Sequence, residues 1–446
     1  MQLTIPQPVS EVLTKLEQNG FDAYIVGGCV RDALLHKTPH DWDITTSALP
    51  QQVMAVFEKE TVLQTGLAHG TVTVLKAGMP IEITTYRIDG DYTDNRRPSS
   101  VTFTPLLKED LMRRDFTINA MAYHPKTGLI DPFGGAKDLQ KKRICCVGDP
   151  HLRFTEDALR IMRALRFAAV LNFTIEPQTA HALLQKKDTL CAIAAERIRD
   201  ELLLLLCGES CAEILRNNYP VLGVWLPELL PMVGFAQHTP YHAYDVWEHT
   251  LHTIAACENT PVMRLTMLLH DIGKPHTFTM DENGIGHFYG HGKVSTEITG
   301  RILQRLKCSN TLKKQVSTLV KHHDIRCENS AVWVRRQLRK FGPDLFLQLL
   351  AVHKADITGQ NPKLLHRLDD LAQCEALTKE ILAESPCFSL RDLAVNGTDL
   401  INNGIPQGKK IGQALQFLLS AVVEQECKNE KSALLCYLQQ HRSQFT

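Results

Sequence analysis

Residues 27–46, GGCVRDALLHKTPHDWDITT, decide the fold and the chemistry of the N-terminal part of this 446-residue chain. An apolar run at 21–26 predicts a short strand that ends on the two glycines, and glycines at a strand-to-helix junction let the backbone approach a phosphate closely. Asp41 and Asp43 stand two residues apart on the next predicted strand, so both carboxylates point to one face and can hold divalent cations. The segment therefore indicates phosphoryl or nucleotidyl transfer.

Outward from this segment, roughly the first 145 residues alternate between helical and strand patterns. A helix is predicted at 8–20, and further strands are predicted at 71–76 and 81–87. From Thr155 onward helical patterns dominate and strand signals almost vanish. We therefore predict an α+β chain, with a mixed-sheet head followed by an all-helical neck, body and tail. The predicted domains are the head at 1–145, the neck at 146–220, the body at 221–370 and the tail at 371–446.

The bulk composition limits the possible environments and partners. Lys plus Arg and Asp plus Glu both number 49, so a nucleic-acid site would have to be a local basic patch. The N-terminus lacks the basic start and apolar run of a signal peptide, and no stretch approaches the ~20 apolar residues needed to span a bilayer. Thirteen scattered cysteines without a Cys-x-x-Cys pair favour reduced thiols. We expect a cytoplasmic protein with no membrane partner.

The quoted segment resembles the signature of the class II tRNA nucleotidyltransferase and bacterial poly(A) polymerase family, within the DNA polymerase β superfamily. The resemblance implies a polymerase-β-like head in which Gly28 and Arg31 contact the nucleoside triphosphate. It also implies that Asp41 and Asp43 bind Mg²⁺. Glu82, on a later predicted strand, could be the third carboxylate of such a site or a surface glutamate.

A second motif lies at 110–120, DLMRRDFTINA. Adjacent arginines before an apolar helix are often merely exposed to solvent, but within the family pattern Arg114 is expected to touch the nucleotide and Asp115 to select its ribose. Between the two motifs, residues 86–98 predict a polar loop, which could also be a plain linker. The loop is reported as shortened in relatives that add only the two cytidines. Here it is intact, which favours addition of the terminal adenosine.

The segment 156–167, EDALRIMRALRF, places polar groups at steps of three. On a helix, residues three positions apart lie on nearly the same side and shift only slowly around the axis. The four side chains are therefore predicted to form one continuous ridge. Aspartate accepts and arginine donates hydrogen bonds, which matches the edges of cytosine and adenine, although a solvated helix face is the other interpretation. The family resemblance implies that Asp157 and Arg160 read the incoming base, with Arg163 and Arg166 nearby.

Histidines and aspartates recur in the second half of the chain in a defined order. Imidazole and carboxylate ligands together suit Mn, Fe, Ni, Co or Zn better than Mg alone. The order resembles the HD phosphohydrolase superfamily, which implies hydrolysis of phosphate monoesters or 2′,3′-cyclic phosphates by a metal-activated water. Such a module could repair damaged tRNA ends, or it could be vestigial or regulatory. The residues that carry the resemblance are His249, His270, Asp271, His291, His323 and Asp356.

Together these motifs predict an enzyme that adds CMP, CMP and AMP to the 3′ end of tRNA, using CTP and ATP and no nucleic-acid template. A dedicated A-adding enzyme and a poly(A) polymerase are the alternatives, but residues 63–72, LQTGLAHGTV, fit the tRNA branch better than the arginine-rich signature that is usual in poly(A) polymerases. Gly408, Lys409 and Lys410 in the tail could grip RNA phosphates or form a capped surface loop. The chain is predicted to be a monomer or a homodimer.

Three further classes of protein fit the sequence less well. A protein uridylyltransferase would add ligand-sensing domains, for which the chain after Asp356 leaves little room. A stringent-response synthetase and hydrolase places its HD module first, whereas the order here is reversed. A non-enzymatic RNA-binding protein would require the metal-binding residues to be decoys.

Overall fold

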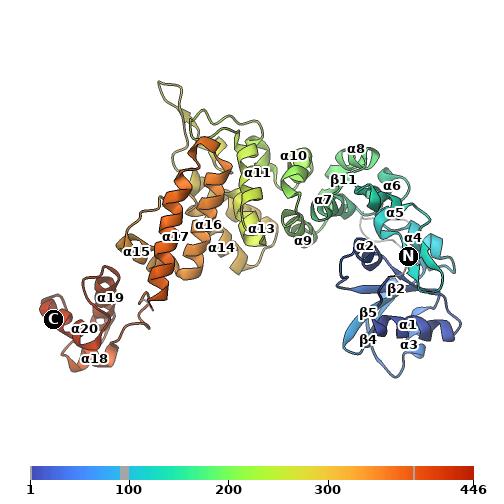
Figure 1. Ribbon diagram of the computed structural model, residues 1–446, viewed down its shortest axis with the longest axis horizontal. Helices are drawn as coiled ribbons and strands as arrows, with labels where there is room; N and C mark the ends of the chain where they lie inside the picture. Colours follow the sequence, from blue (N-terminus) through green and yellow to red (C-terminus); the bar gives the residue numbers. More distant parts are fainter. Residues whose placement is uncertain (1–2, 91–99, 385–386, 446) are drawn as a thin grey trace. The chain divides into compact units, whose positions relative to one another are not determined.

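The computed structural model describes residues 3–90, 100–384 and 387–445. It divides into two compact units, Met1–Leu230 and Pro231–Thr446, and each is described by itself. Figure 1 shows a sheet with its helices in the first unit and helices almost throughout the second. Most of the loop predicted at 86–98 lies outside the described residues.

The head of unit 1 is built on a seven-stranded sheet with the strand order β3-β4-β5-β2-β1-β8-β9. Neighbouring strands pair antiparallel except β2 and β5, which run parallel and set Asp43 opposite Glu82. The mixed-sheet head predicted from the sequence is therefore confirmed. The strands are β1 (Ala23–Val26), β2 (Trp42–Thr46), β3 (Thr61–Gly66), β4 (Thr71–Lys76), β5 (Met79–Thr85), β8 (Ala122–His124) and β9 (Gly128–Ile130), and the separate ribbon is β6 (Arg87–Asp89) with β7 (Val101–Phe103).

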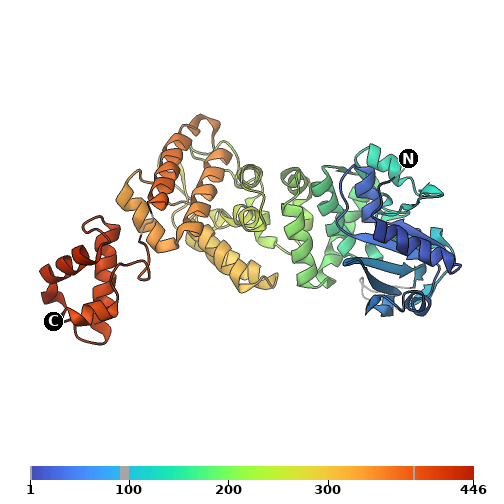
Figure 2. The same ribbon diagram turned by 60° about the horizontal axis from the view of Figure 1, so that its bottom comes forward.

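Amphipathic helices cover the sheet because their apolar residues recur at helical spacing. α1 (Gln7–Gln18) packs against β1, β2 and β4, beside α3 (Pro50–Val56), as Figures 1 and 2 show. α2 (Gly28–Leu34) follows directly on Gly27, whose φ of 83° is one that glycine adopts without strain. The buried face of α1 carries Val9, Val12, Leu13 and Leu16.

The remainder of unit 1 is mostly helical, with α7 (Leu159–Leu171) at its centre. α7 packs along α9 (Ala195–Leu206), and nearly all of its buried side chains are apolar. Two short strands, β10 (Arg143–Ile144) and β11 (Thr174–Ile175), pair in parallel next to it. The other helices are α4 (Leu107–Met112), α5 (Gly135–Gln140), α6 (Pro150–Glu156), α8 (Pro177–Lys186) and α10 (Cys211–Leu222).

The continuous helix predicted over 156–167 is wrong at its start. α6 ends one residue before Asp157 and α7 begins two residues after it, and Asp157 itself has extended backbone angles (φ −134°, ψ 103°). Its carboxylate accepts a hydrogen bond from Leu159 N at 3.0 Å, and its carbonyl oxygen accepts one from Arg160 N at 3.0 Å. Aspartate often accepts hydrogen bonds from nearby main-chain N–H groups in this way, and this competes with a place inside a helix. Only the three arginines therefore share a helix.

Unit 2 contains two groups of helices with separate apolar cores. In the first group α16 contacts α11, α12, α14, α15 and α17; the second group is α18 to α20. α17 runs across residue 370, and the four domain limits given above remain a prediction. The helices are α11 (Val246–Ala256), α12 (Pro261–Leu269), α13 (His291–Arg305), α14 (Asn310–Lys321), α15 (Ala331–Phe341), α16 (Pro343–Gly359), α17 (Arg367–Ala383), α18 (Gly397–Asn402), α19 (Lys409–Val423) and α20 (Lys431–Gln440), and the hairpin is β12 (Thr279–Met280) with β13 (Gly286–His287).

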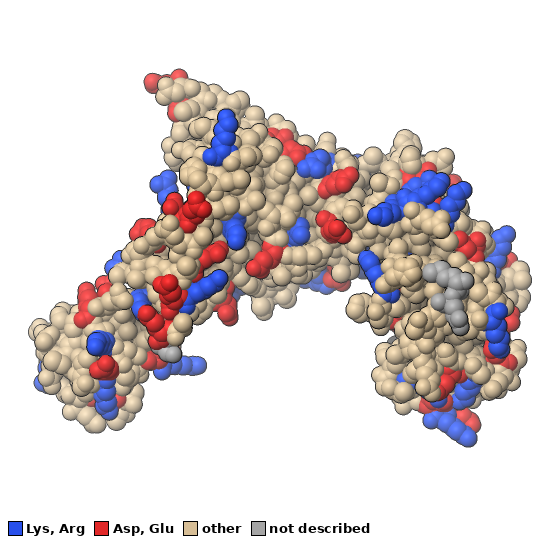
Figure 3. Space-filling model, in the orientation of Figure 1, with Lys and Arg blue, Asp and Glu red and all other residues tan. Residues whose placement is uncertain are grey.

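Surface charge is uneven although the chain has no net charge. On the face of unit 1 in Figure 3, Lys and Arg side chains gather near α6, whereas both signs are interspersed over unit 2. In the described ranges no helix combines the length and apolarity that crossing a membrane requires. All thirteen cysteines are free thiols in this structure.

Candidate active site and candidate metal centre

Three predicted carboxylates occupy neighbouring positions of the head sheet. Asp43 is in β2, Asp41 directly precedes that strand, and Glu82 is paired with Asp43 across the parallel β5. Burial, together with the negative charges of Glu82 and Asp41, raises the pKa of Asp43 to about 6 against the opposing effect of Arg114. A divalent cation relieves such a cluster of like charges, and an all-carboxylate donor set suits Mg²⁺.

The glycine turn lies against these carboxylates. A Cβ on Gly27 would lie 3.1 Å from Arg114 Nη1, so a side chain at this position would displace the arginine. Gly28 begins α2, and Arg31 on the same helix donates a hydrogen bond from Nη1 to Asn119 Oδ1 at 2.7 Å. The sequence pattern alone does not point to Asn119, although that residue lies within the second motif.

A buried carboxylate that the sequence analysis missed organises the second motif. Asp110, fully buried in α4, accepts hydrogen bonds from Arg113 Nη2 at 2.7 Å and from Arg114 Nη2 at 3.4 Å. Asp115 Oδ2 accepts one from Arg163 Nε at 2.8 Å. Burial works to raise the pKa of Asp115, but Arg163, the hydrogen bond from Asn119 and the charge of Arg160 together outweigh burial, and the pKa is lowered to about 2. Asp115 is therefore held as an anion.

These elements converge on one cavity of about 460 Å³ in unit 1. Phe167 supports its arginines, because the guanidinium carbons of Arg166, Arg31 and Arg163 lie 4.0, 5.1 and 5.3 Å from its ring centroid. Arg166 Nε also donates to Glu201 Oε2 at 2.6 Å. Asp41 and Glu82 are not part of the cavity lining. The predicted site residues that line it are Gly28, Arg31, Asp43, Arg114, Asp115, Asp157, Arg160, Arg163 and Arg166.

Asp157 and Arg160 present a carboxylate and a guanidinium to this cavity in fixed orientations. Asp157 Oδ2 accepts a hydrogen bond from Arg197 Nη2 at 3.3 Å. Arg160, 8% exposed, donates from Nη1 to Glu156 Oε2 at 2.6 Å and from Nη2 to the Arg113 carbonyl oxygen at 2.8 Å. Groups that must discriminate between bases need this kind of restraint, because a mobile side chain would adapt to either base.

The six predicted ligands of the second module come together in unit 2. They form two groups, and Asp271 belongs to both. Within each group the ligand atoms all lie within 4.8 Å of one another. Its Oδ2 lies 3.3 Å from His249 Nε2, and its Oδ1 lies 3.5 Å from His291 Nε2. The first group is His249, His270, Asp271 and Asp356, and the second is Asp271, His291 and His323.

All four imidazoles of this centre are oriented in the same way. In each ring Nδ1 lies 2.7–2.9 Å from a main-chain carbonyl oxygen, and a carbonyl can only accept, so Nδ1 carries the proton. The Nε2 atoms of His249 and His270 are 3.2 Å apart, and those of His291 and His323 are 3.0 Å apart. Two Nε2 atoms that face each other at this separation need a proton or a metal cation between them, and this orientation of the rings is typical of metal ligands.

The two carboxylates of the centre also attract positive charge. Burial works to lower the pKa of His270, but Asp271 and Asp356 outweigh burial and raise it to about 10. Burial works to raise the pKa of Asp271, yet His270 and Lys274 hold it well below its ordinary value. Oδ1 of this buried carboxylate receives no hydrogen bond within the part of the chain that the structure describes. The donor set of imidazoles and carboxylates fits a transition metal.

Two side chains that support the ligands were not predicted. Gln360 Nε2 donates to Asp356 Oδ2 at 2.8 Å, so it orients the second oxygen of that ligand. Lys274 Nζ lies 2.7 Å from Asp271 Oδ2 and donates to Gln237 Oε1 at 2.8 Å. Lys274 follows Asp271 by three residues, and this spacing is the only sequence signal that could have identified it.

The mixed sheet, the glycine turn and the arginine-lined cavity define a nucleotidyltransferase. Three family models match the chain: the poly(A) polymerase head domain at 23–145, the RNA- and SrmB-binding site of polymerase A at 172–229, and tRNA nucleotidyltransferase domain 2 at 277–438. The head model alone does not separate CCA addition from poly(A) synthesis, because both branches share it.

Relatives that match along the whole chain distinguish CCA addition from poly(A) synthesis. The chain is 36% identical over 430 residues to the CCA-adding enzyme of Levilactobacillus brevis, with 95% of each chain covered. It is 35% identical over 436 residues to that of Geobacillus stearothermophilus, with 96% of this chain and 95% of the relative covered. The crystal structure of the Bacillus stearothermophilus CCA-adding enzyme in complex with CTP matches with a TM-score of 0.75 at 32% identity, and 99% of both chains is covered. The chain belongs to the family of CCA-adding enzymes, the CCA tRNA nucleotidyltransferases, so the predicted family and enzyme class are confirmed.

Proposed function

We propose that this chain completes the 3′ end of tRNA by adding CMP, CMP and AMP from CTP and ATP without a nucleic-acid template. The observation that carries the proposal is the single cavity that joins Asp43, Arg114 and Asp115 of the head to Asp157 and the arginines of α7. The Bacillus stearothermophilus relative was crystallised with CTP, which supports a cytidine nucleotide as one substrate.

Within this cavity each group has a proposed task. Gly28, Arg31 and Arg114 hold the triphosphate, because a glycine turn and guanidinium groups suit phosphate oxygens. Asp41, Asp43 and Glu82 hold Mg²⁺, which when bound stabilises the charge on the attacking and leaving oxygens. Asp115, kept ionised by Arg163, accepts a hydrogen bond from the ribose hydroxyl.

Base selection falls to the neck. The Asp157 carboxylate accepts hydrogen bonds and the Arg160 guanidinium donates them, so together they complement the pairing edge of cytosine or adenine. Arg163 and Arg166 complete the wall and are braced by Asp115 and Glu201. Because protein side chains rather than a template face the base, the product sequence is set by the enzyme.

The test uses the full chain with Mg²⁺ and tRNA transcripts that end before the first C, the second C or the terminal A. Labelled CTP and ATP should be incorporated in the order C, C, A, and the product should stop there. A variant with Asp41→Ala and Asp43→Ala should incorporate nothing. Addition of A alone, or a homopolymer tail made from ATP, would contradict the proposal.

We propose that the centre in unit 2 is a metal-dependent phosphohydrolase that acts on phosphate monoesters or 2′,3′-cyclic phosphates. Four Nε2 atoms and two carboxylates support it, because a bound Mn, Fe, Co, Ni or Zn ion that displaces the proton on His270 would find a complete donor set. A bound ion would supply a water that is acidic enough to attack phosphorus near neutral pH. In a cyclic phosphate the water oxygen joins phosphorus, one P–O(ribose) bond breaks, and the released ribose oxygen takes a proton, leaving a 2′- or 3′-monoester.

The test strips the full chain with EDTA, reloads it with each metal and follows hydrolysis of p-nitrophenyl phosphate and of 2′,3′-cyclic AMP. Asp271→Ala, which removes the ligand shared by both groups, should abolish hydrolysis and leave CCA addition intact. Absence of hydrolysis with every metal, or hydrolysis that persists in Asp271→Ala, would show that the centre is not a hydrolase.

A further inference from the structure

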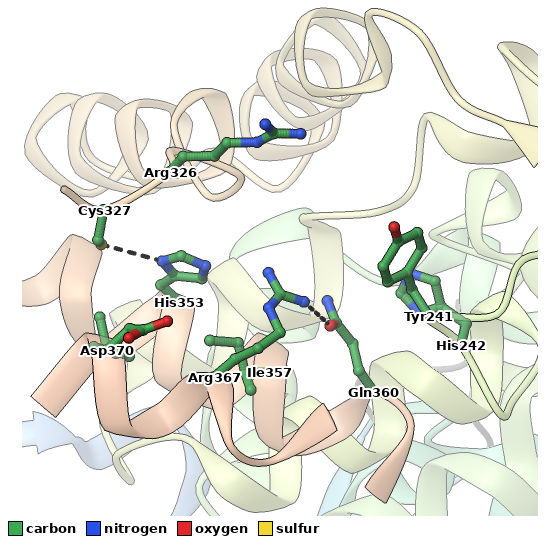
Figure 4. Close-up of a pocket in the computed structure, with 10 residues that line it drawn as sticks. Tyr241, His242, Arg326, Cys327, His353, Ile357, Gln360, Arg367 and Asp370 are labelled. Carbon is green, nitrogen blue, oxygen red and sulfur yellow. Dashed lines mark hydrogen bonds between the residues drawn. The ribbon is translucent and has the colours of Figure 1, made fainter. Parts of the chain in front are cut away.

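A second cavity adjoins the metal centre of unit 2. One cavity of about 470 Å³ contains metal ligands such as Asp271 and His323, and another of about 490 Å³ leads from it toward α17. We call them the metal arm and the side arm of one cleft, because six residues line both. The shared residues are Tyr241, His242, Arg326, His353, Gln360 and Arg367, and Figure 4 shows the side arm.

Two arginines line both arms, and the carboxylates of Asp370 in the side arm and Asp324 in the metal arm lie in the same cleft. Arg326, in the loop after α14, is exposed, and among the described residues no hydrogen bond or ion pair joins it to another side chain. Arg367, at the start of α17, donates from Nη1 to Gln360 Oε1 at 2.8 Å and keeps further N–H groups for a ligand. Figure 4 shows Arg326 extended along one wall of the pocket and Arg367 pointing up from the opposite wall beside His353. A pair of guanidinium groups facing one space suits a phosphate.

The rest of the side arm suits a flat, partly apolar ring. Ile357 and Leu371, both almost completely buried, form an apolar part of a lining that also contains Cys327 and Asp370. Tyr241 stands at the shared wall with 57% of its surface exposed, so its ring is accessible to a ligand in the cleft. Exposed aromatic side chains beside a cationic groove are the usual platform for stacking a nucleobase.

The side arm is also tied directly to the metal centre. Arg367 donates to Gln360, and Gln360 donates to Oδ2 of the ligand Asp356, so two hydrogen bonds connect the pocket to the centre. A molecule held by Arg367 therefore lies next to the ligands. The volume of about 490 Å³ is within the range of small-molecule sites, roughly 300–1,000 Å³, so it accommodates one nucleotide but not folded RNA.

We infer that the side arm is a nucleoside subsite of the unit 2 centre, an inference that rests on the hydrolase proposed above. It takes a ribonucleoside with a phosphate on its 2′ or 3′ oxygen. The base lies against Tyr241 and the apolar lining, and Arg326 and Arg367 direct the phosphate toward the metal arm. Both the 3′-terminal nucleotide of a damaged RNA and a free mononucleotide can carry a phosphate at this position.

Binding to the EDTA-treated full chain tests the subsite without any hydrolysis. Calorimetric titration with adenosine 3′-monophosphate and with inorganic phosphate is compared between the parent and single variants. Arg326→Ala should weaken binding of both by about tenfold, the loss of one charge-assisted contact. Tyr241→Ala should weaken nucleotide binding more than phosphate binding. Arg301→Ala, an exposed arginine on α13 away from the cleft, is the matched control.

The variants also separate the subsite from the hydrolase. If the metal-loaded parent hydrolyses p-nitrophenyl phosphate but Arg326→Ala binds adenosine 3′-monophosphate as tightly as the parent, the subsite is overturned and the hydrolase stands. If no metal supports hydrolysis but binding falls as expected, the hydrolase is overturned and the subsite stands. With activity present, Arg326→Ala should raise KM for 2′,3′-cyclic AMP about tenfold with little change in kcat, and Arg367→Lys should retain more activity than Arg367→Ala.

A final comparison identifies the source of the nucleotide. The kcat/KM for a tRNA ending in a 2′,3′-cyclic phosphate is compared with that for 2′,3′-cyclic AMP. A higher value for the tRNA assigns the subsite to an RNA end, and a higher value for the mononucleotide assigns it to a free nucleotide. If neither competes with adenosine 3′-monophosphate for the pocket, the subsite is overturned.

Discussion

Removing the Asp43 carboxylate should stabilise the head while it destroys transfer. The pKa of this group is raised to about 6 from its ordinary value of 3.8. The folded chain therefore holds the Asp43 proton more tightly than the unfolded chain. The stability that this proton contributes is fully present below about pH 3.8 and is lost as the pH rises through about 6. A difference of about two pKa units corresponds to roughly 3 kcal/mol. Asp43→Asn should exceed the parent in stability by up to ~3 kcal/mol at pH 8, but by less than ~1 kcal/mol at pH 4.

Hydrogen exchange followed by mass spectrometry measures this effect in the head alone, because peptides from β2 and β5 report the opening of that sheet. The parent and the variant are compared in EDTA between pH 4 and pH 8, with intrinsic exchange rates corrected for pH. Added Mg²⁺ should stabilise the parent but not Asp43→Asn. Glu58→Gln, at an exposed head position, is the matched control. An equal gain at pH 4 and pH 8 would refute the reasoning, because the charge of the carboxylate would then not be the cause.

Three further substitutions test the neck and the metal centre. Asp157→Ala should reduce discrimination between CTP and ATP by about tenfold while largely sparing the fold, and unchanged selectivity in competition assays would exclude base reading by Asp157. Arg163→Met leaves the Asp115 anion buried without its main partner and should lower the free energy of unfolding by about 3–5 kcal/mol at pH 7. Hydrogen exchange in the head measures this loss of stability. An unchanged free energy of unfolding would contradict a stabilising ion pair between Arg163 and Asp115. Gln360→Leu should weaken Mn²⁺ binding by about 10- to 100-fold in a metal titration, because Asp356 loses the donor that orients it, and unchanged affinity would exclude that role.

Short motifs were predictable because their chemistry depends on residues that are close together in sequence. The spacing of Asp41 and Asp43 gives a common face on any strand, and the preceding glycines announce the turn. Glu82 could be only a candidate, because its place opposite Asp43 depends on the parallel pairing of β2 with β5 across a gap of 39 residues. Local patterns carry no information on which strands pair.

Helix periodicity also misled where a side chain competes with the backbone. Asp157 fits the three-residue repeat of the arginines, yet it lies in the junction before α7, where its carboxylate accepts a hydrogen bond from Leu159 N. Asp110 and Glu201 escaped notice because a buried acid that positions arginines looks, in sequence, like any acid on a helix.

The sequence by itself determined the class of chemistry, namely two carboxylates behind a glycine turn and an ordered set of histidines and aspartates. These are properties of residue type and local spacing. Only the tertiary structure decided that Asp271 belongs to both groups of metal ligands, that Asp157 faces the cavity from a helix junction, and that Arg326 and Arg367 share a cleft with the metal centre. The reason is physical, because these contacts join segments that are far apart in the chain, and only the packing of apolar helix and sheet faces brings them together.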